Sequence, residues 1–168
     1  NADTAQQIGY AGVMLEGSCL HFFHGLWSEE MRGRKINIAV LEAWSVAMTA
    51  ATWGAMFEGR KVVFRTDSEA SCNCLNKLWS GSLEMQAVCD LWEDLQHRFG
   101  FEGLVLFCPG VENRLSDKAS RCKSRDKVAA KLREELTMME MSHVEVQEWD
   151  VRWECGDVRV DITDFLLR

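Results

Sequence analysis

The spacing of apolar residues changes at about residue 40, and this change constrains the fold more than any other feature of the sequence. Before it, apolar side chains gather in short runs at residues 4–15 and 19–26, separated by the turn signal Gly17-Ser18. These runs predict a β-hairpin, and a short third strand near residues 35–39 is expected to complete an antiparallel meander. From residues 40 to 57, apolar residues recur at helical spacing, which predicts an amphipathic helix.

The rest of the chain alternates between strand and helix patterns. Compact apolar runs at residues 61–66 and 103–108 predict two buried strands. Helical patterns are expected at residues 69–79, from the Trp79–Ser82 break to about His97, around Asp117, and beyond Lys123. An alternating stretch at residues 143–163, with a turn signal at Gly156-Asp157, predicts a C-terminal hairpin. This order of elements predicts an α/β fold in which helices cover the faces of a mixed sheet.

Four acidic residues occupy positions that can converge at one edge of such a sheet. Asp3 opens the first apolar run, and Glu42 lies in the first turn of the long helix. Asp67 directly follows a predicted strand, and Asp117 lies four residues after Asn113. A cluster of like charges is unstable unless a cation neutralises it, and carboxylate oxygens suit magnesium or manganese. The pattern therefore predicts a metal-dependent site that acts on phosphates.

Taken alone, each of these carboxylates is more readily explained as a surface acid or a helix cap. Glu42 departs furthest from that explanation because it lies beside Val40, Leu41 and Trp44 at an otherwise apolar helix start. Asp67 comes second, since it ends a predicted buried strand.

The composition is that of a globular protein, with 168 residues, of which 47% are hydrophobic and 27% charged. No apolar run reaches the roughly 20 residues needed to span a bilayer, and the first residues do not form a signal peptide. We therefore expect no membrane contact, and the missing initial Met suggests a piece of a longer polypeptide.

Seven cysteines without a regular framework predict free thiols in a reducing intracellular compartment, the cytoplasm or the nucleus. The lack of a C-x-x-C pair argues against structural zinc.

The net charge of −7 is unusual for a protein that handles nucleic acid, because such proteins are generally basic. Residues 1–122 contain 11 Lys and Arg against 15 Asp and Glu, which leaves no basic stripe in that part of the chain. We therefore expect affinity for a nucleic acid to come largely from other parts of the parent protein.

The order of the four acidic segments resembles that in the ribonuclease H domains that follow reverse transcriptases in retroelements, especially in tyrosine-recombinase and related retrotransposon groups. The matching segments are Asp3 with Gly9–Val13, Val40–Val46 around Glu42, Val63–Ser68 around Asp67, and Pro109–Asn113 with Asp117 and Ala119-Ser120-Arg121. The resemblance covers residues 1–122 and implies a ribonuclease H-like catalytic domain. Its five-stranded mixed sheet would have antiparallel strands 1–3 and parallel strands 4 and 5. Residues 123–168 would form a C-terminal extension of a helix and a hairpin.

The resemblance implies endonucleolytic hydrolysis of the RNA strand of RNA–DNA hybrids by two Mg²⁺ ions, with Mn²⁺ as a possible substitute, to give 5′-phosphate products. Asp3 would bridge both ions, and Asp117 would help to hold the ion that activates water. Glu42 and Asp67 would hold the ion that stabilises the leaving oxygen. The implied partners are the hybrid and the upstream reverse transcriptase domain of the same polyprotein.

Recognition of RNA requires contacts to 2′-hydroxyl groups across a wide, shallow minor groove. The residues expected to contact the substrate are Gly9, Gly12, Ser68, Ser71, Asn73, Trp79, Asn113 and Arg114. Turn and cap chemistry explains the polar members of this set equally well. Trp44 and Trp92 have the helical spacing of core residues.

Two features depart from the family pattern. Phe107 stands where many members carry a His that is thought to help product leave, so turnover is expected to be slow. The basic protrusion with which some members grip the hybrid is not apparent between residues 79 and 84.

Two alternatives to a ribonuclease H stay open. One is a catalytically silent ribonuclease H-like scaffold or interaction domain, although a scaffold has no physical need for four converging acids. The other is an integrase-like polynucleotidyl transferase, against which the spacing from Asn113 to Asp117 and the Pro109-Gly110 loop argue.

Overall fold

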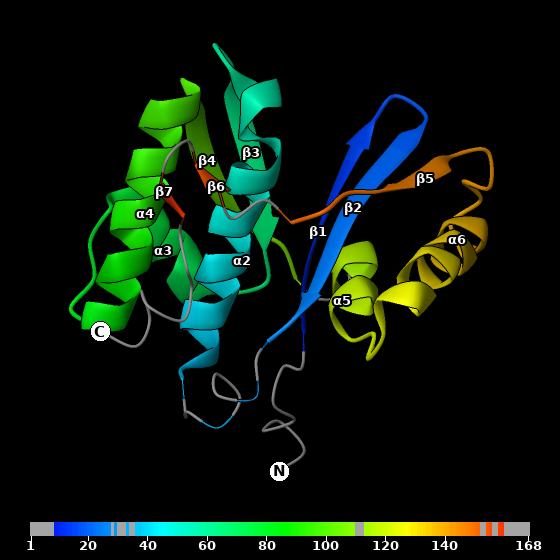
Figure 1. Ribbon diagram of the computed structural model, residues 1–168, viewed down its shortest axis with the longest axis horizontal. Helices are drawn as coiled ribbons and strands as arrows, with labels where there is room; N and C mark the ends of the chain where they lie inside the picture. Colours follow the sequence, from blue (N-terminus) through cyan, green and yellow to red (C-terminus); the bar gives the residue numbers. More distant parts are fainter. Residues whose placement is uncertain are drawn as a thin grey trace. The chain divides into compact units, whose positions relative to one another are not determined.

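The computed structural model describes residues 9–27, 29, 33, 36–109, 113–151, 154–155 and 158–159. The protein has an α/β fold that divides into two compact units, whose helices and strands are shown in Figure 1. Unit 1 comprises residues 1–36 and 114–150, and unit 2 comprises residues 37–113 and 151–168.

Unit 1 is built on a three-stranded mixed sheet with the order β1-β2-β5. β1 (Gly9–Glu16) and β2 (Cys19–Leu26) form a hairpin that turns at Gly17, where a φ of +58° favours glycine. β5 (Glu145–Glu148) pairs with β2 in parallel. The Trp149 indole N–H donates to His21 Nδ1 at 2.9 Å, which fastens the end of β5 to β2.

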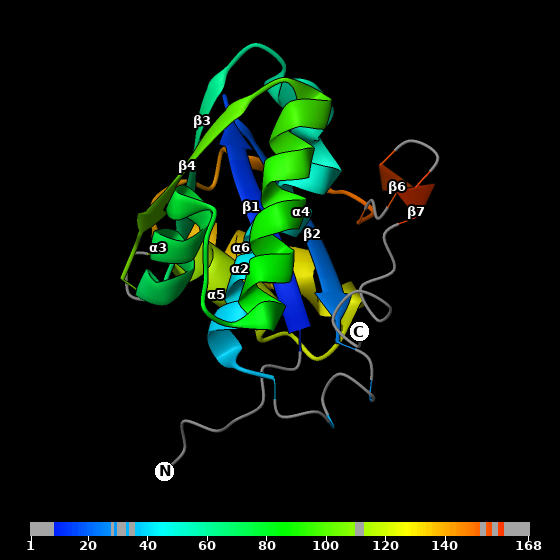
Figure 2. The same ribbon diagram turned by 90° about the vertical axis from the view of Figure 1, so that its left-hand side faces the viewer.

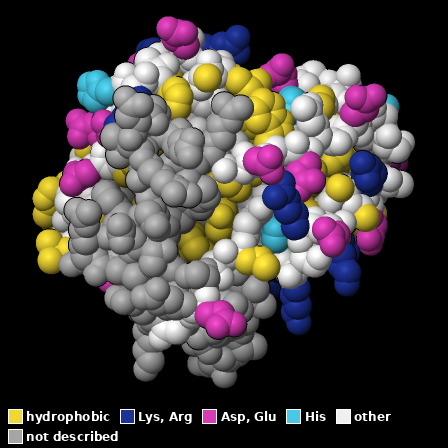
Figure 3. All heavy atoms as spheres, viewed as in Figure 1, with side chains coloured by type: hydrophobic (Ala, Val, Ile, Leu, Met, Phe, Trp, Pro, Cys, Tyr) yellow, Lys and Arg dark blue, Asp and Glu magenta, His cyan; other side chains and the backbone are white. Residues whose placement is uncertain are grey.

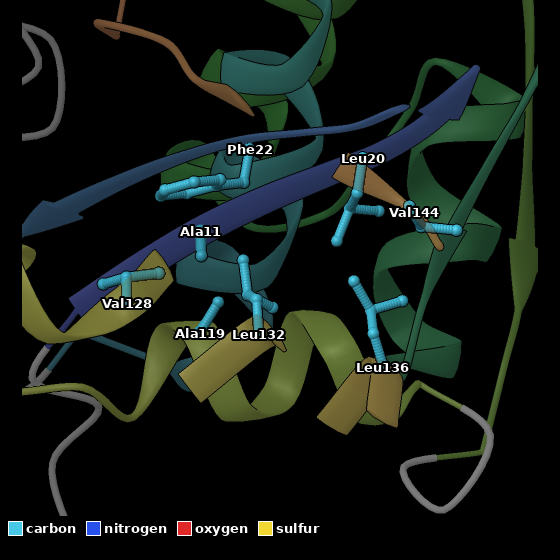
Figure 4. Packing of buried hydrophobic residues seen from close by; sticks show 8 residues of the cluster. All are labelled: Ala11, Leu20, Phe22, Ala119, Val128, Leu132, Leu136 and Val144. Atoms are coloured by element: carbon cyan, nitrogen blue, oxygen red, sulfur yellow. The ribbon is translucent and has the colours of Figure 1, made fainter. Parts of the chain in front are cut away.

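Two helices form the core of unit 1 together with this sheet. α5 (Arg114–Ser120) packs on β1, and the short 3-10 helix η3 (Arg125–Lys127) leads into α6 (Val128–Met138). Side chains from the strands point toward those from the helices (Figure 4). The cluster consists of Ala11, Leu20, Phe22, Ala119, Val128, Leu132, Leu136 and Val144. Their removal from water is the main term that stabilises this unit.

Unit 2 combines a parallel pair of strands with helices. β3 (Lys61–Thr66) pairs with β4 (Glu102–Phe107) in parallel, and Figure 2 shows the two strands side by side. Its helices are α2 (Ile38–Trp53), which continues into the 3-10 helix η2 (Gly54–Phe57), α3 (Glu69–Lys77) and α4 (Leu83–Phe99). A short antiparallel pair, β6 (Glu154–Cys155) and β7 (Val158–Arg159), forms the C-terminal hairpin that the sequence predicts.

An aromatic cluster joins β3, α4 and the start of β4. The Phe64 ring meets the Trp92 ring edge-on with centroids 4.9 Å apart, and Phe57 and Phe101 complete the cluster. Edge-to-face pairs of this kind stabilise a fold beyond the apolar area that they bury. Trp44 and Trp92 are 0% and 1% exposed, so the predicted core positions of both are confirmed.

One side chain covers the outer edge of β4. The Asn76 amide donates to the Val105 carbonyl at 2.7 Å and accepts from the Val105 N–H at 2.9 Å. Asn76 therefore replaces a neighbouring strand at this point, and it satisfies backbone groups that an open sheet edge would leave unpaired.

The predicted third strand near residues 35–39 is wrong. Ile38 and Ala39 belong to α2, because the Asn37 side chain caps this helix by accepting a hydrogen bond from the Ala39 N–H at 2.8 Å. β5 takes the third place in the sheet instead, parallel rather than antiparallel to β2. Apart from the β6–β7 pair, the described strands form separate sheets of three and two strands, where a single five-stranded sheet is predicted.

The predicted α/β class and the order of the other helices and strands agree with the structure. Within the described part of the chain, no helix is both long enough and apolar enough to cross a membrane.

Candidate functional site

The four predicted catalytic acids fall in different parts of the structure. Glu42 and Asp67 belong to unit 2, and Asp117 belongs to unit 1. Asp3 lies outside the described residues, as do residues 110–112 of the predicted loop. Among the described residues, no group of three or more His, Cys, Asp or Glu side chains is placed to hold a metal ion. The structure therefore brings two of the four acids into one unit.

Glu42 and Asp67 belong to one corner of unit 2, which we define as the end of β3 and the starts of α2 and α3. Hydrogen bonds join these three parts. Asp67 directly follows β3, and Ser68 then caps α3 by accepting a hydrogen bond from the Ser71 N–H at 3.2 Å. The Ser71 hydroxyl donates to the carbonyl of Ala39, in the first turn of α2, at 2.7 Å. Glu42 is three residues further along α2, less than one helical turn from Ala39. The starts of α2 and α3 are thus joined at the carboxyl end of β3.

Ser71 holds this corner together from the inside. The residue is 0% exposed, and its hydroxyl oxygen lies 2.8 Å from that of Ser68. A buried hydroxyl costs free energy unless it has hydrogen-bond partners, and here it has two. At the end of β3, the Cys108 N–H donates to the Thr66 carbonyl at 2.8 Å and extends the β3–β4 pairing to the corner. The Ser71 hydroxyl, a predicted substrate contact, is therefore engaged within the protein.

Replacing Ser71 by Ala is expected to lower the free energy of unfolding by about 1–2 kcal/mol, because the change removes a buried hydrogen bond. Urea unfolding followed by circular dichroism measures this loss. Ser45→Ala is the matched control, since among the described residues the Ser45 hydroxyl bonds only to the Leu41 carbonyl of its own helix. Equal losses in the two variants would contradict the linking role of Ser71.

The corner reaches solvent through Asp67. Along β3, Phe64 and Thr66 are buried, whereas Arg65 and Asp67 are exposed, as the alternation of a strand requires. The Asp67 carboxylate has no ion pair or hydrogen bond within the described part of the chain, so its oxygens are available to a ligand. Carboxylates near helix starts are also favoured by the helix dipole. The corner can therefore supply oxygen ligands to a hard divalent cation.

In unit 1, the Asp117 carboxylate is ion-paired. It accepts a hydrogen bond from Arg121 Nε at 3.0 Å, and the Arg121 side chain is 77% exposed. An exposed pair of this kind contributes about 0–1 kcal/mol, so Arg121 holds Asp117 only weakly. The four-residue spacing of an acid and a base along one helix is the sequence signal for this pair.

Arg114, a predicted substrate contact, is paired with a buried acid that the sequence analysis missed. Arg114 Nη2 lies 2.9 Å from Glu135 Oε2, and Lys118 Nζ lies 3.9 Å from the other oxygen of that carboxylate. The Glu135 side chain is 3% exposed, and a buried carboxylate requires such partners. The position of Glu135 between Leu132 and Leu136, on the apolar face of α6, is the signal that could have found it.

The other predicted substrate contacts differ in exposure. Those at the surface or half-buried are Ser68, Asn73, Trp79 and Asn113. Gly9 and Gly12 are buried in β1, and a Cβ atom at Gly9 would lie 2.8 Å from the Gly25 carbonyl oxygen. Gly9 therefore allows close packing within unit 1.

Trp79 is 67% exposed on a turn that Gln86 fixes. The Gln86 amide donates to the Leu78 carbonyl at 3.2 Å and accepts from the Ser80 N–H at 2.7 Å. The large indole surface is therefore presented to solvent by a fixed backbone.

The shifted pKa values away from the corner have structural causes. Burial lowers the pKa of His24, whose Nε2–H donates to the Cys122 carbonyl at 3.0 Å. Burial raises the pKa of Cys89 to about 11, and its thiol donates to the Cys74 carbonyl. Both groups are neutral at pH 7 and serve packing.

Comparisons of the chain with models of protein families, with curated proteins and with solved structures gave no significant match. Its function is therefore inferred from the corner that carries Glu42 and Asp67 and from the sequence segments around the four acids.

Proposed function

We propose that this chain is a ribonuclease H-type endonuclease that hydrolyses the RNA strand of RNA–DNA hybrids. It would act as part of a polyprotein, next to an upstream reverse transcriptase domain. The observation that carries this proposal is the hydrogen bond between Ser71 and Ala39, which joins the starts of α2 and α3 and attaches Glu42 and Asp67 to one corner. The sequence order of the four acidic segments, which resembles that of ribonuclease H domains, supports the same function.

The donor set at the proposed site fits magnesium or manganese, because all four side chains are carboxylates. Glu42 and Asp67 would hold one ion at the corner, and Asp3 and Asp117 would complete a site for two. When bound, the ions supply charge stabilisation at the phosphate and an activated water. Asp117 would release Arg121 to take part.

A cleavage assay with the full chain tests the proposal. Labelled RNA–DNA hybrid, double-stranded RNA and double-stranded DNA are each incubated with and without Mg²⁺. We expect cleavage of the RNA strand of the hybrid alone, only with Mg²⁺, and with 5′-phosphate products. Joining or nicking of double-stranded DNA would indicate a polynucleotidyl transferase instead. A folded chain that leaves the hybrid intact would contradict the proposal and favour an interaction domain.

A further inference from the structure

Basic residues are concentrated in one short segment of this acidic chain. Residues 114–133 contain eight Lys and Arg and only two acidic residues, a net charge of +6 in a chain with a net charge of −7. The segment forms α5, η3 and the first half of α6, all within unit 1. A division of the chain at residue 122 cuts through this run, so residues 1–122 taken alone show no basic stripe.

Acidic neighbours neutralise part of this charge. Five of the eight basic side chains have acidic partners within 4.0 Å: Arg114 and Lys118 pair with Glu135, Arg121 with Asp117, Arg125 with Glu148 and Asp150, and Lys131 with Glu134. Lys123, Lys127 and Arg133 are exposed, and none of them has an ion pair within the described residues. The segment therefore keeps positive charge that no acidic side chain of the described residues neutralises.

Three lysines lie between the end of α5 and the end of the first turn of α6. Lys127 and Lys131 are one helical turn apart, and therefore lie on the same side. Burial raises the pKa of the Cys122 thiol, and the positive charges of Lys131 and Lys127 oppose this rise. Lys123 directly follows Cys122 and is exposed. We refer to Lys123, Lys127 and Lys131 as the α5–α6 lysine cluster. On the face shown in Figure 3, Lys and Arg side chains project from the part that unit 1 forms, with acidic side chains among them.

The start of α6 carries positive charge that the helix disfavours, although Lys131 pairs with Glu134 and Asp126 precedes Lys127. Like charges four residues apart destabilise a helix by about 0.2–0.5 kcal/mol. The first turn of α6 contains no acidic residue, although acids are the residues that the dipole favours at a helix start. Lys127 precedes that turn and Lys131 closes it, so both place positive charge at the end of the helix where it is disfavoured.

We propose that the α5–α6 lysine cluster binds the phosphate backbone of a nucleic acid and provides affinity that the net charge of the chain conceals. This inference deepens the proposed function and rests on it for the identity of the polyanion. Lysine is a flexible point charge that suits phosphate oxygens. Residues 114–133 include no aromatic side chain that could stack on bases, so the contact is independent of base sequence.

The test compares the wild-type full chain with the double variant Lys123→Glu/Lys127→Glu. Fluorescence anisotropy in EDTA measures the binding of two labelled RNA–DNA hybrids of different sequence over a series of KCl concentrations. The matched control is Arg60→Glu/Lys61→Glu, which changes the net charge equally at exposed positions of unit 2. Folding is expected to be preserved, because Lys127→Glu places a favourable acid four residues before Lys131.

We expect the lysine-cluster variant to bind both hybrids at least about tenfold more weakly at low salt. The slope of log affinity against log salt should fall by about two, since each phosphate contact contributes roughly 0.9. The control variant should lose much less. Equal losses in the two variants, an unchanged salt slope, or no binding by the wild type would overturn the inference, and an acidic protein surface would then be the better ligand.

The binding measurement tests the lysine cluster separately from the proposed nuclease activity. If the cluster variant loses binding while the wild type cleaves no nucleic acid with Mg²⁺, the nuclease activity fails and the phosphate-binding surface stands. If the wild type cleaves hybrid while the cluster variant binds as the control does, the surface fails and the nuclease activity stands.

Discussion

Replacing Asp67 by Asn is expected to lower the rate of Mg²⁺-dependent hybrid cleavage by at least about a thousandfold, which corresponds to about 4 kcal/mol of lost transition-state stabilisation. The substitution keeps the size of the side chain and removes the negative charge that would hold a cation at the corner. Asp67 is exposed and makes no side-chain hydrogen bond or ion pair within the described residues, so the free energy of unfolding should change by less than about 0.5 kcal/mol. Single-turnover cleavage and urea unfolding measure the two quantities.

Asp90→Asn is the matched control for this experiment. Asp90 is an exposed carboxylate of the same unit, and its Oδ1 accepts a hydrogen bond from Gln86 that an Asn oxygen can also accept. The control should retain the wild-type rate. Full activity of Asp67→Asn would remove Asp67 from the site, and with it the role of the corner in metal binding.

Hydrophobic spacing was sufficient to predict most of the helices and strands, because each of those patterns is local. The third strand shows where such reasoning fails. Ile36-Asn37-Ile38 alternates like a strand, yet Asn37 is an N-cap and the helix starts two residues earlier than its apolar spacing indicates. The strand that joins β2 is instead β5, whose residues Glu145–Glu148 are mostly polar and carry no strong apolar pattern.

The place of β5 depends on contacts between residues far apart in the sequence. The Trp149 indole bonds to His21, 128 residues away, and Arg125 pairs with both Glu148 and Asp150. The spacing of apolar residues carries no information about such long-range contacts. The sequence therefore predicts strand structure in this region but does not show that the strand pairs with β2.

For the candidate site, too, the sequence shows local signals but not the contacts between distant residues. The apolar neighbours of Glu42 and the position of Asp67 after a buried strand identified both as unusual acids. The hydrogen bond that joins their helices connects Ser71 to Ala39, 32 residues away, and the sequence gives no sign of it. Ser71 was expected to contact the substrate because a hydroxyl suits that role, whereas its burial is a tertiary property.

Replacing Trp92 by Ala is expected to lower the free energy of unfolding by about 3–5 kcal/mol, the usual cost of removing a large aromatic side chain from a core. Trp92 is 1% exposed and contacts the rings of Phe64 and Phe101. A Cβ atom at Gly103 would lie only 2.5 Å from its indole, so β4 packs closely against it. Because domains are typically stable by about 5–15 kcal/mol, the loss should shift the urea midpoint strongly.

Trp79→Ala is the matched control, because it makes the same substitution at the surface. The Trp79 indole is 67% exposed, and its removal should lower the free energy of unfolding by less than about 1 kcal/mol. A similar loss of unfolding free energy for both substitutions would contradict the division of the tryptophans into core and surface.

The Trp92→Ala variant should also cleave hybrid more slowly under conditions in which it remains folded. Phe64 loses its main ring contact when Trp92 is removed, and Phe64 lies only three residues before Asp67 on the strand that positions this carboxylate. A folded Trp92→Ala variant with the wild-type cleavage rate would show that the aromatic cluster does not position the corner.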